Sequence, residues 1–250
     1  MITDPWFWLL AIPAVTALGL SKGGFAGIGM ISTPLLALVI SPLQGAAILL
    51  PILLLQDVFS MWIYRRDWDA WNLKVMLPGA VVGVGAAWLF AAYVSDAYIE
   101  LTVGIIGLAF VFYSWLRRPP LEHRKPSAGS GAFWGGLSGF CSTIIQVGAP
   151  PYQIHVLPQR MEKLTLVGTT VMFFGLVNSM KIVPYFALGQ FSTHGLATSV
   201  VLFPLAIATN FLGVWLVRRT PTELFYRISY FLVFFISIIL IWQGTNLILK

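Results

Sequence analysis

Long apolar stretches constrain this chain more than any other feature. Leu73–Tyr93 and Phe231–Trp242 show no alternation of polar and apolar residues, so they predict helices rather than strands. A membrane-spanning helix needs roughly 20 apolar residues, and its backbone polar groups must be paired inside the protein. Only 10% of the 250 residues are charged, whereas about a quarter are charged in a soluble domain. The sequence therefore predicts an all-α membrane protein.

The apolar stretches divide into clear spans and broken ones. Two stretches, Trp6–Ile40 and Gly131–Leu157, are interrupted by glycine and proline. Each is interpreted either as one crossing or as a helical hairpin that returns to the same face. The clear spans are Leu43–Tyr64, Leu73–Tyr93, Ile99–Trp115, Leu164–Leu188, His194–Val217 and Tyr226–Leu247.

The placement of Lys and Arg decides between these two interpretations. Nearly all of them lie in short gaps between apolar runs, where such residues mark the cytoplasmic face. If both broken stretches cross the membrane, the basic gaps are divided between the two faces. If both are hairpins, all the basic gaps lie on one face, so we predict hairpins and both termini outside the cytoplasm. The formal charge of +6 is thus a topology signal, and no nucleic-acid partner is expected.

The order of basic gaps also indicates two inverted repeats, each a broken hairpin helix followed by three transmembrane helices. In the first half, the gap after the second element is basic and the next gap contains no Lys or Arg, and in the second half this order is reversed. Inverted repeats with broken helices are typical of secondary transporters, whose site lies between the repeats. We predict a single transmembrane domain over 1–250, with repeat 1 at 1–116, a cytoplasmic linker at 117–130 and repeat 2 at 131–250. The local matches are Gly24-Phe25 with Gly139-Phe140, and Leu77-Pro78 with Phe203-Pro204.

The first break carries a lysine beside glycines, Lys22, Gly23 and Gly24. A charge at the centre of a helix in lipid costs at least about 2.5–3.5 kcal/mol, so it needs a partner or water. A broken helix leaves unpaired N–H groups, and a cation beside such amides favours an anion. The alternatives are that Lys22 reaches the membrane interface or only pairs with Asp57.

The second break offers neutral donors. Hydroxyl and amide groups can donate hydrogen bonds to an oxyanion, and an inverted pair would place this break opposite the first. The alternative is that the hydroxyls bond carbonyls of their own helix, and Cys141 is interpreted as a packing residue. The candidate residues are Ser138, Cys141, Ser142, Thr143 and Gln146.

Three polar residues, Gln56, Asp57 and Asn178, occupy comparable places on the helix after each broken stretch. They are candidates to line the same site or to hydrogen-bond across helices. Asp57 is either a proton carrier or a charge partner of Lys22 or Lys181. Neutralisation is favoured because a lone acid gives no proton path. Lys181 is nearer a helix end, so we expect it to extend to the membrane interface.

Catalysis finds no support in the sequence. The histidines His123, His155 and His194 lie in different segments without metal-ligand spacing, and no nucleotide or nucleophile motif is present. We therefore expect no enzymatic activity, no metal and no cofactor.

The two broken segments resemble the TauE/SafE family of sulfite exporters, also called the sulfite/organosulfonate permease family. The resemblance extends over essentially the whole chain and implies a bacterial inner-membrane transporter for sulfur-containing or carboxylate anions. Family members often carry a second glycine-rich run where this chain reads Cys-Ser-Thr-Ile-Ile-Gln. The matching stretches are Ser21–Gly29 with Pro34, Gly135–Phe140, Gly148–Pro151 and Glu162–Thr170 with Asn178.

The expected function is thus secondary transport of sulfite or an organosulfonate by alternating access, with export as the expected direction. Thiosulfate and small carboxylates remain alternative substrates, and a non-transporting membrane scaffold is an alternative class. The expected partners are the small anion and the lipid bilayer. Coupling ion and homo-oligomer formation are left open by the sequence.

Overall fold

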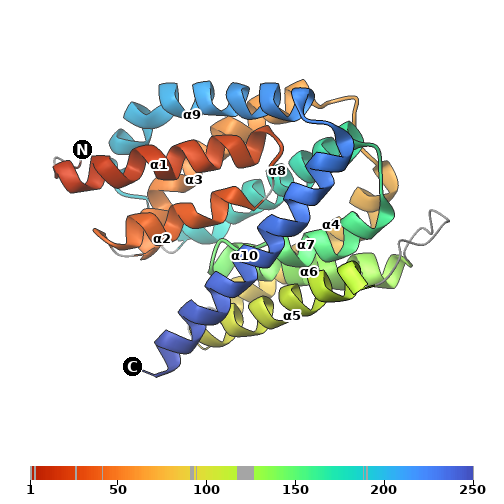
Figure 1. Cartoon of the computed structure of the whole chain (residues 1–250). Coiled ribbons are helices and arrows are strands. Elements are labelled where there is room, and N and C mark those ends of the chain that lie inside the picture. The colour runs from red at the N-terminus through yellow and green to blue at the C-terminus, as the bar shows by residue number, and fades with distance from the viewer. Residues whose placement is uncertain are drawn as a thin grey trace. The chain divides into compact units, whose positions relative to one another are not determined.

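The computed structural model of the chain describes residues 2–249 except 3, 26, 41, 91, 92, 94, 117–126, 188 and 190. Every regular element in this part is a helix, which confirms the predicted all-α class. The elements shown in Figure 1 are α1 (Pro5–Gly23), η1 (Ile28–Ile31), α2 (Ser32–Ala37), α3 (Pro42–Ile63), α4 (Ala70–Phe90), α5 (Asp96–Leu116), α6 (Ala128–Ile144), α7 (Ala149–Val156), η2 (Leu157–Gln159), α8 (Lys163–Ala187), α9 (Thr193–Arg219) and α10 (Thr222–Ile248).

Among the described residues, seven helices are long and apolar enough to cross a membrane. Six of them, α3, α4, α5, α8, α9 and α10, coincide with the clear spans predicted from the sequence. The seventh is α1, the first arm of the first broken stretch. The number and length of these apolar helices therefore identify the chain as a multi-pass membrane protein.

The first broken stretch folds as a hairpin of helices. The Asp4 side chain caps α1 by accepting a hydrogen bond from the Trp6 backbone N–H at 2.9 Å. After Gly24, η1 and α2 return along α1, as Figure 1 shows. The Ser32 hydroxyl at the start of α2 donates to the carbonyl of Ala14 at 2.7 Å, which fastens the two arms together.

The second broken stretch has the same form. It begins earlier than predicted, because Ser127 caps α6 and accepts a hydrogen bond from the Ser130 N–H, so α6 starts inside the predicted linker. The rest of that linker, 117–126, lies outside the described residues. The chain turns after Ile144, and α7 packs back on α6. The Ser138 hydroxyl donates to the Gly148 carbonyl at 2.8 Å and joins the two arms.

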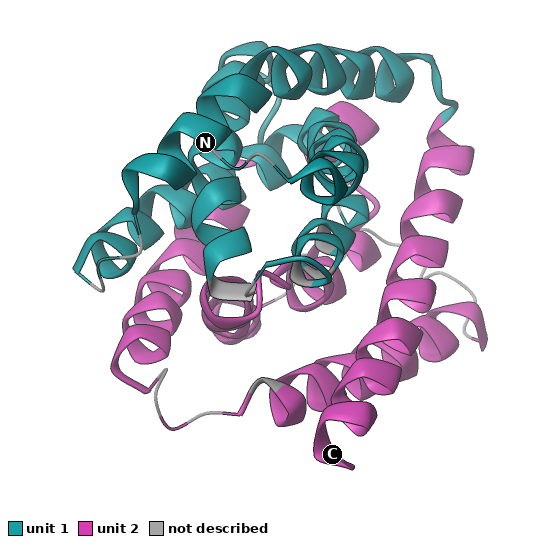
Figure 2. Cartoon of the chain, turned by 90° about the vertical axis from the view of Figure 1, so that its left-hand side faces the viewer, with its two compact units in different colours: residues 1–68, 167–221 teal, residues 69–166, 222–250 magenta. Residues whose placement is uncertain are grey.

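The helices gather into two compact units, coloured separately in Figure 2. Unit 1 comprises 1–68 and 167–221, and unit 2 comprises 69–166 and 222–250. Each unit takes helices from both halves of the sequence, so the units do not coincide with the predicted repeats. The repeats themselves stay a prediction.

Within each unit a broken helix packs against a helix of the other sequence half. In unit 1, α1 packs along α9, and in unit 2, α6 packs along α4. The first element of each half therefore packs on the third element of the other half. In unit 2, α5 and α10, the last elements of the two halves, also pack together. The pairing of helices is thus reciprocal between the two halves of the sequence.

Glycines make both crossings close. A Cβ added to Gly23 would lie 2.4 Å from the Cα of Gly213, where α1 crosses α9. A Cβ on Gly79 would lie 2.0 Å from the carbonyl oxygen of Ala132, where α4 crosses α6. Backbones can approach this closely only where side chains are absent. The small residues of α1, α4, α6 and α9 at these two crossings therefore let the helix backbones touch.

Candidate functional site

Lys22 lies in the last turn of α1 and is buried, with 9% of its surface exposed. Its ammonium group donates to Oδ1 of Asp57 on α3 at 2.5 Å. Asp57 is 2% exposed, so the pair is shielded from water. Of the alternatives for Lys22, the structure contains the ion pair and not an extension to the interface.

The second oxygen of the Asp57 carboxylate is also bound. Asn178 on α8 donates from Nδ2 to Asp57 Oδ2 at 2.7 Å. The carboxylate thus links α1, α3 and α8, and three of the residues singled out from the sequence meet at one point.

The location of Lys181 differs from the one predicted from the sequence. It was expected to extend to the membrane interface, but its side chain is fully buried. It lies one turn after Asn178 on α8, and residues three apart share a helix face. Its charge interacts with those of Lys22 and Asp57, so the cluster contains two lysines and one aspartate. The prediction was based on the position of Lys181 near the end of α8. It is wrong because tertiary packing covers this part of the helix.

At the glycine break, the backbone N–H groups of Gly24 and Phe25 are both paired. The Gly24 N–H donates to the Ser21 carbonyl at 3.1 Å, and the Phe25 N–H donates to the Leu20 carbonyl at 3.2 Å. These two bonds form a Schellman ending of α1, with Gly24 at a φ of +143° that favours glycine. The expectation of unpaired backbone donors is wrong for these two amides, because the chain satisfies them with its own helix end. Gly23 and Gly24 serve the crossing and the turn.

Side chains on one face of α3 and directly after it bind the carbonyl groups at the C-terminal end of α1. The Ser60 hydroxyl donates to the Lys22 carbonyl at 3.1 Å, and the Tyr64 hydroxyl donates to the Gly23 carbonyl at 2.8 Å. Together with Asp57 they are spaced three and four residues apart, which places them on one helix face. The sequence analysis missed Ser60 and Tyr64. Their spacing from Asp57 was the signal that could have found them.

A second polar contact joins α3 to α9. Gln56 donates from Nε2 to the Ala206 carbonyl at 3.0 Å. Asn210, which the sequence analysis also missed, donates from Nδ2 to Ser60 Oγ at 2.7 Å and to the Gln56 carbonyl at 3.2 Å. Both side chains are fully buried. Their amide oxygens, Gln56 Oε1 and Asn210 Oδ1, accept no hydrogen bond from the part of the chain that the structure describes.

The residues of the second break lie in unit 2. The Thr143 hydroxyl donates to the Gly139 carbonyl at 2.8 Å, one turn earlier on α6, as in the alternative raised from the sequence. Cys141 is buried and Ser142 nearly so. Gln146 adopts a left-handed φ of 59° in the turn. The expected meeting of the two breaks stays a prediction.

No group of three potential metal ligands occurs among the described residues, and His123 lies outside them. His155 is buried and shares hydrogen bonds with Asn72 and Ser130 within unit 2. These contacts tie α7 to α4 and α6.

A comparison with protein families decides what kind of protein contains this cluster. The family described as sulfite exporter TauE/SafE matches residues 11–240. The chain belongs to the TauE/SafE family. The match covers most of the first broken helix, all of the second and every residue of the Lys22 cluster, and it confirms the resemblance noted from the sequence.

Membership of the TauE/SafE family places the buried cluster in a family of membrane transporters. Comparisons with curated proteins and with solved structures returned no match. The roles of individual residues therefore rest on their geometry in this chain.

Proposed function

We propose that this TauE/SafE protein is a secondary transporter that exports a small anion, sulfite or an organosulfonate, across a bacterial inner membrane. The observation that carries the proposal is the buried cluster of Lys22, Asp57, Asn178 and Lys181 at the end of a broken helix. Ionisable side chains inside membrane helices are costly and usually mark the path of a substrate or ion.

The cluster has a built-in counter-ion. Asp57 accepts hydrogen bonds from Lys22 and Asn178, which are donors that an oxyanion would also use. A bound anion would accept one or both of these hydrogen bonds in place of Asp57. When the site is closed, the Asp57 carboxylate accepts them instead. Alternating access then consists of exchanging one negative group for another at Lys22.

Transport by reconstituted protein tests this proposal. Wild-type protein in liposomes should move radiolabelled sulfite, and Lys22→Ala should reduce the rate at least about tenfold, because a lost ionic hydrogen bond amounts to about 1.5–3 kcal/mol. Lys74→Ala is the matched control, since Lys74 is exposed on α4, and it should transport as wild type does.

Two results would contradict the proposal. Normal transport by folded Lys22→Ala protein would remove Lys22 from the site. No transport by wild type, together with no change in its thermal midpoint on adding sulfite or sulfonates, would favour the scaffold, in which the polar cluster only joins helices.

A further inference from the structure

The helices α3 and α9 run parallel and end side by side in unit 1. The Ser199 hydroxyl donates to the Ile48 carbonyl at 2.7 Å, and further along both helices Asn210 donates to Ser60 Oγ at 2.7 Å. The partners are 151 and 150 residues apart in the sequence, and a constant separation means that the two helices run in the same direction. Their C-terminal ends therefore lie together, as Figure 1 shows.

Aromatic side chains follow one face of this helix pair to its end. The rings of Phe59 on α3 and Phe211 on α9 are 6.0 Å apart. Trp62 and Trp215 come three and four residues later, so they extend the same face by one turn. Both tryptophans are exposed, by 64% and 48%. Tryptophans at the ends of membrane helices lie at the level of the lipid headgroups.

Each of these tryptophans has an arginine stacked on its ring. The guanidinium carbon of Arg65 lies 4.8 Å from the centre of the Trp62 ring, and that of Arg219 lies 4.4 Å from the centre of the Trp215 ring. The cation–π contact holds each guanidinium in place. Arg65 donates one N–H to the Trp62 carbonyl at 2.6 Å, and a guanidinium has five N–H donors in a planar fork that matches phosphate.

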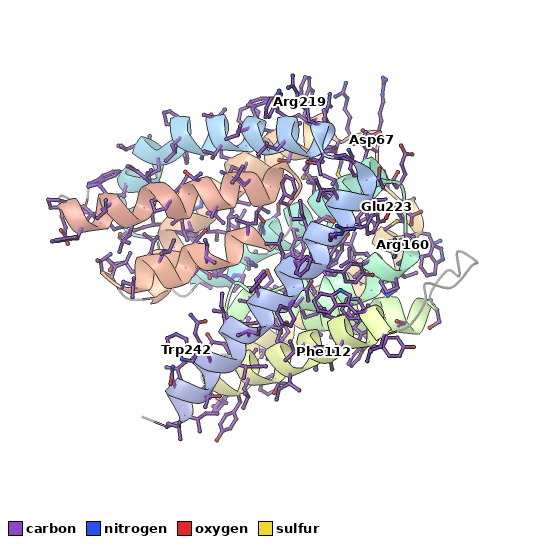
Figure 3. The ribbon with its side chains drawn as sticks, viewed as in Figure 1. Asp67, Phe112, Arg160, Arg219, Glu223 and Trp242 are labelled. Carbon is purple, nitrogen blue, oxygen red and sulfur yellow. The ribbon has the colours of Figure 1, made fainter. Side chains whose placement is uncertain are left out.

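Two more arginines, Arg66 and Arg218, are exposed at the same end of unit 1. The charge of Arg218 acts on the Tyr64 side chain directly after α3, which again places the end of α9 beside the end of α3. Asp67 is the acidic residue of unit 1 at this end, and Figure 3 labels it and Arg219 there. Four arginines and one aspartate make this end of the unit strongly positive.

Arg160 in unit 2 provides a contrast. Its guanidinium carbon lies 5.4 Å from the centre of the Tyr226 ring, so it is stacked in the same way. It lines a pocket together with Glu162 and Glu223, and Figure 3 labels Arg160 and Glu223. Two carboxylates in the same pocket repel an added anion, so stacking on an aromatic ring does not by itself make an anion site.

We propose that the arginines at the paired ends of α3 and α9 bind the phosphate group of an anionic phospholipid. Basic clusters between transmembrane helices on the cytoplasmic side bind such headgroups, and the predicted topology puts this end on that side. The two tryptophans lie against the lipid beneath the headgroup, and the guanidinium groups stacked on them contact the phosphate. The inference concerns the surface of unit 1 and goes beyond the proposed transport.

Lipid binding to the purified full chain in detergent gives the first test, with native mass spectrometry as the readout. Phosphatidylglycerol should bind more tightly than phosphatidylcholine, whose own ammonium group neutralises its phosphate. Arg65→Gln and Arg219→Gln should each lower the affinity for phosphatidylglycerol about fivefold, which is the effect of one basic residue at an anionic surface. Arg160→Gln is the matched control, because it also removes an exposed, stacked arginine, and it should leave the affinity unchanged.

The second test separates the stacked arrangement from net charge. Trp62→Leu and Trp215→Leu keep all four arginines and an apolar residue, but they remove the rings that position two of the guanidinium groups. Each should lower the ratio of phosphatidylglycerol affinity to phosphatidylcholine affinity about two- to fivefold. Trp242→Leu, which removes an exposed tryptophan from α10 in unit 2, should keep the ratio. Because the ratio is taken within one variant, a change in overall stability affects both lipids alike.

Several outcomes would overturn the inference. Equal affinity of wild type for the two lipids would remove the site, and an equal loss in Arg160→Gln or an unchanged ratio in both tryptophan variants would show that net charge alone attracts the lipid. Displacement of phosphatidylglycerol by inorganic phosphate at the same concentration would show that the arginines bind a soluble anion instead. Transport of sulfite is measured separately, so failure of lipid binding leaves the proposed function standing.

Discussion

At the scale of single residues, Asp57 is the centre of the cluster, because both of its oxygens are bound by side chains from other helices. Asp57→Asn should retain an acceptor for Asn178 but remove the only buried negative charge described in unit 1. Breaking a buried ion pair from one side costs about 3–5 kcal/mol. We therefore expect a clearly lower thermal midpoint in detergent, measured by the fluorescence of the tryptophans.

The size of this loss should depend on added anions. Because the lysines of the Asp57→Asn variant lack their counter-ion, a bound anion should raise its midpoint more than it raises that of wild type. The control is Ser199→Ala, which is also buried on α9 but lies outside the cluster. The carboxylate is not the counter-ion if the Asp57→Asn protein is as stable as wild type. The same holds if anions raise its thermal midpoint no more than they raise that of wild type.

At the scale of elements, the fold depends on two helix crossings that only glycine permits. Gly79 and Gly85 lie on the same helix, α4, but Gly79 contacts the α6 backbone whereas a Cβ on Gly85 meets nothing within 4 Å. Gly79→Ala should therefore destabilise the protein by separating α4 from α6. Gly85→Ala should be neutral or stabilising by up to about 1 kcal/mol, because alanine is the better helix former.

Thermal unfolding of the two variants in one detergent checks this contrast. If both variants have the same midpoint as wild type, the α4–α6 crossing is looser than its geometry indicates. The comparison does not depend on the transport proposal, since neither glycine belongs to the Lys22 cluster.

At the scale of the whole molecule, we infer that both termini lie outside the cytoplasm. The inference follows from the distribution of Lys and Arg over the gaps between helices. In a Cys141→Ala background, cysteines introduced at Asp4 and Leu249 should react with a membrane-impermeant maleimide in intact cells. Cysteines at Arg66 and Thr220 should react only after the cells are opened. The reverse pattern would invert the topology, and labelling of Asp4 and Leu249 under different conditions would mean that a hairpin crosses the membrane.

Apolar length determined, from the sequence alone, the helical class and the six clear spans, and the placement of Lys and Arg in the gaps between spans pointed to the two hairpins. This is because a backbone in lipid has few ways to pair its polar groups. The rarity of charge in those spans also pointed to Lys22 and Asp57.

Only the tertiary structure decided which groups surround them. The burial of Lys181, the contacts of Ser60, Tyr64 and Asn210, and the Schellman ending at Gly24 depend on which helix faces pack together. Composition cannot encode that choice, since α1 packs on α9, a helix far along the chain. Local spacing shows which residues share a face, and packing determines what that face meets.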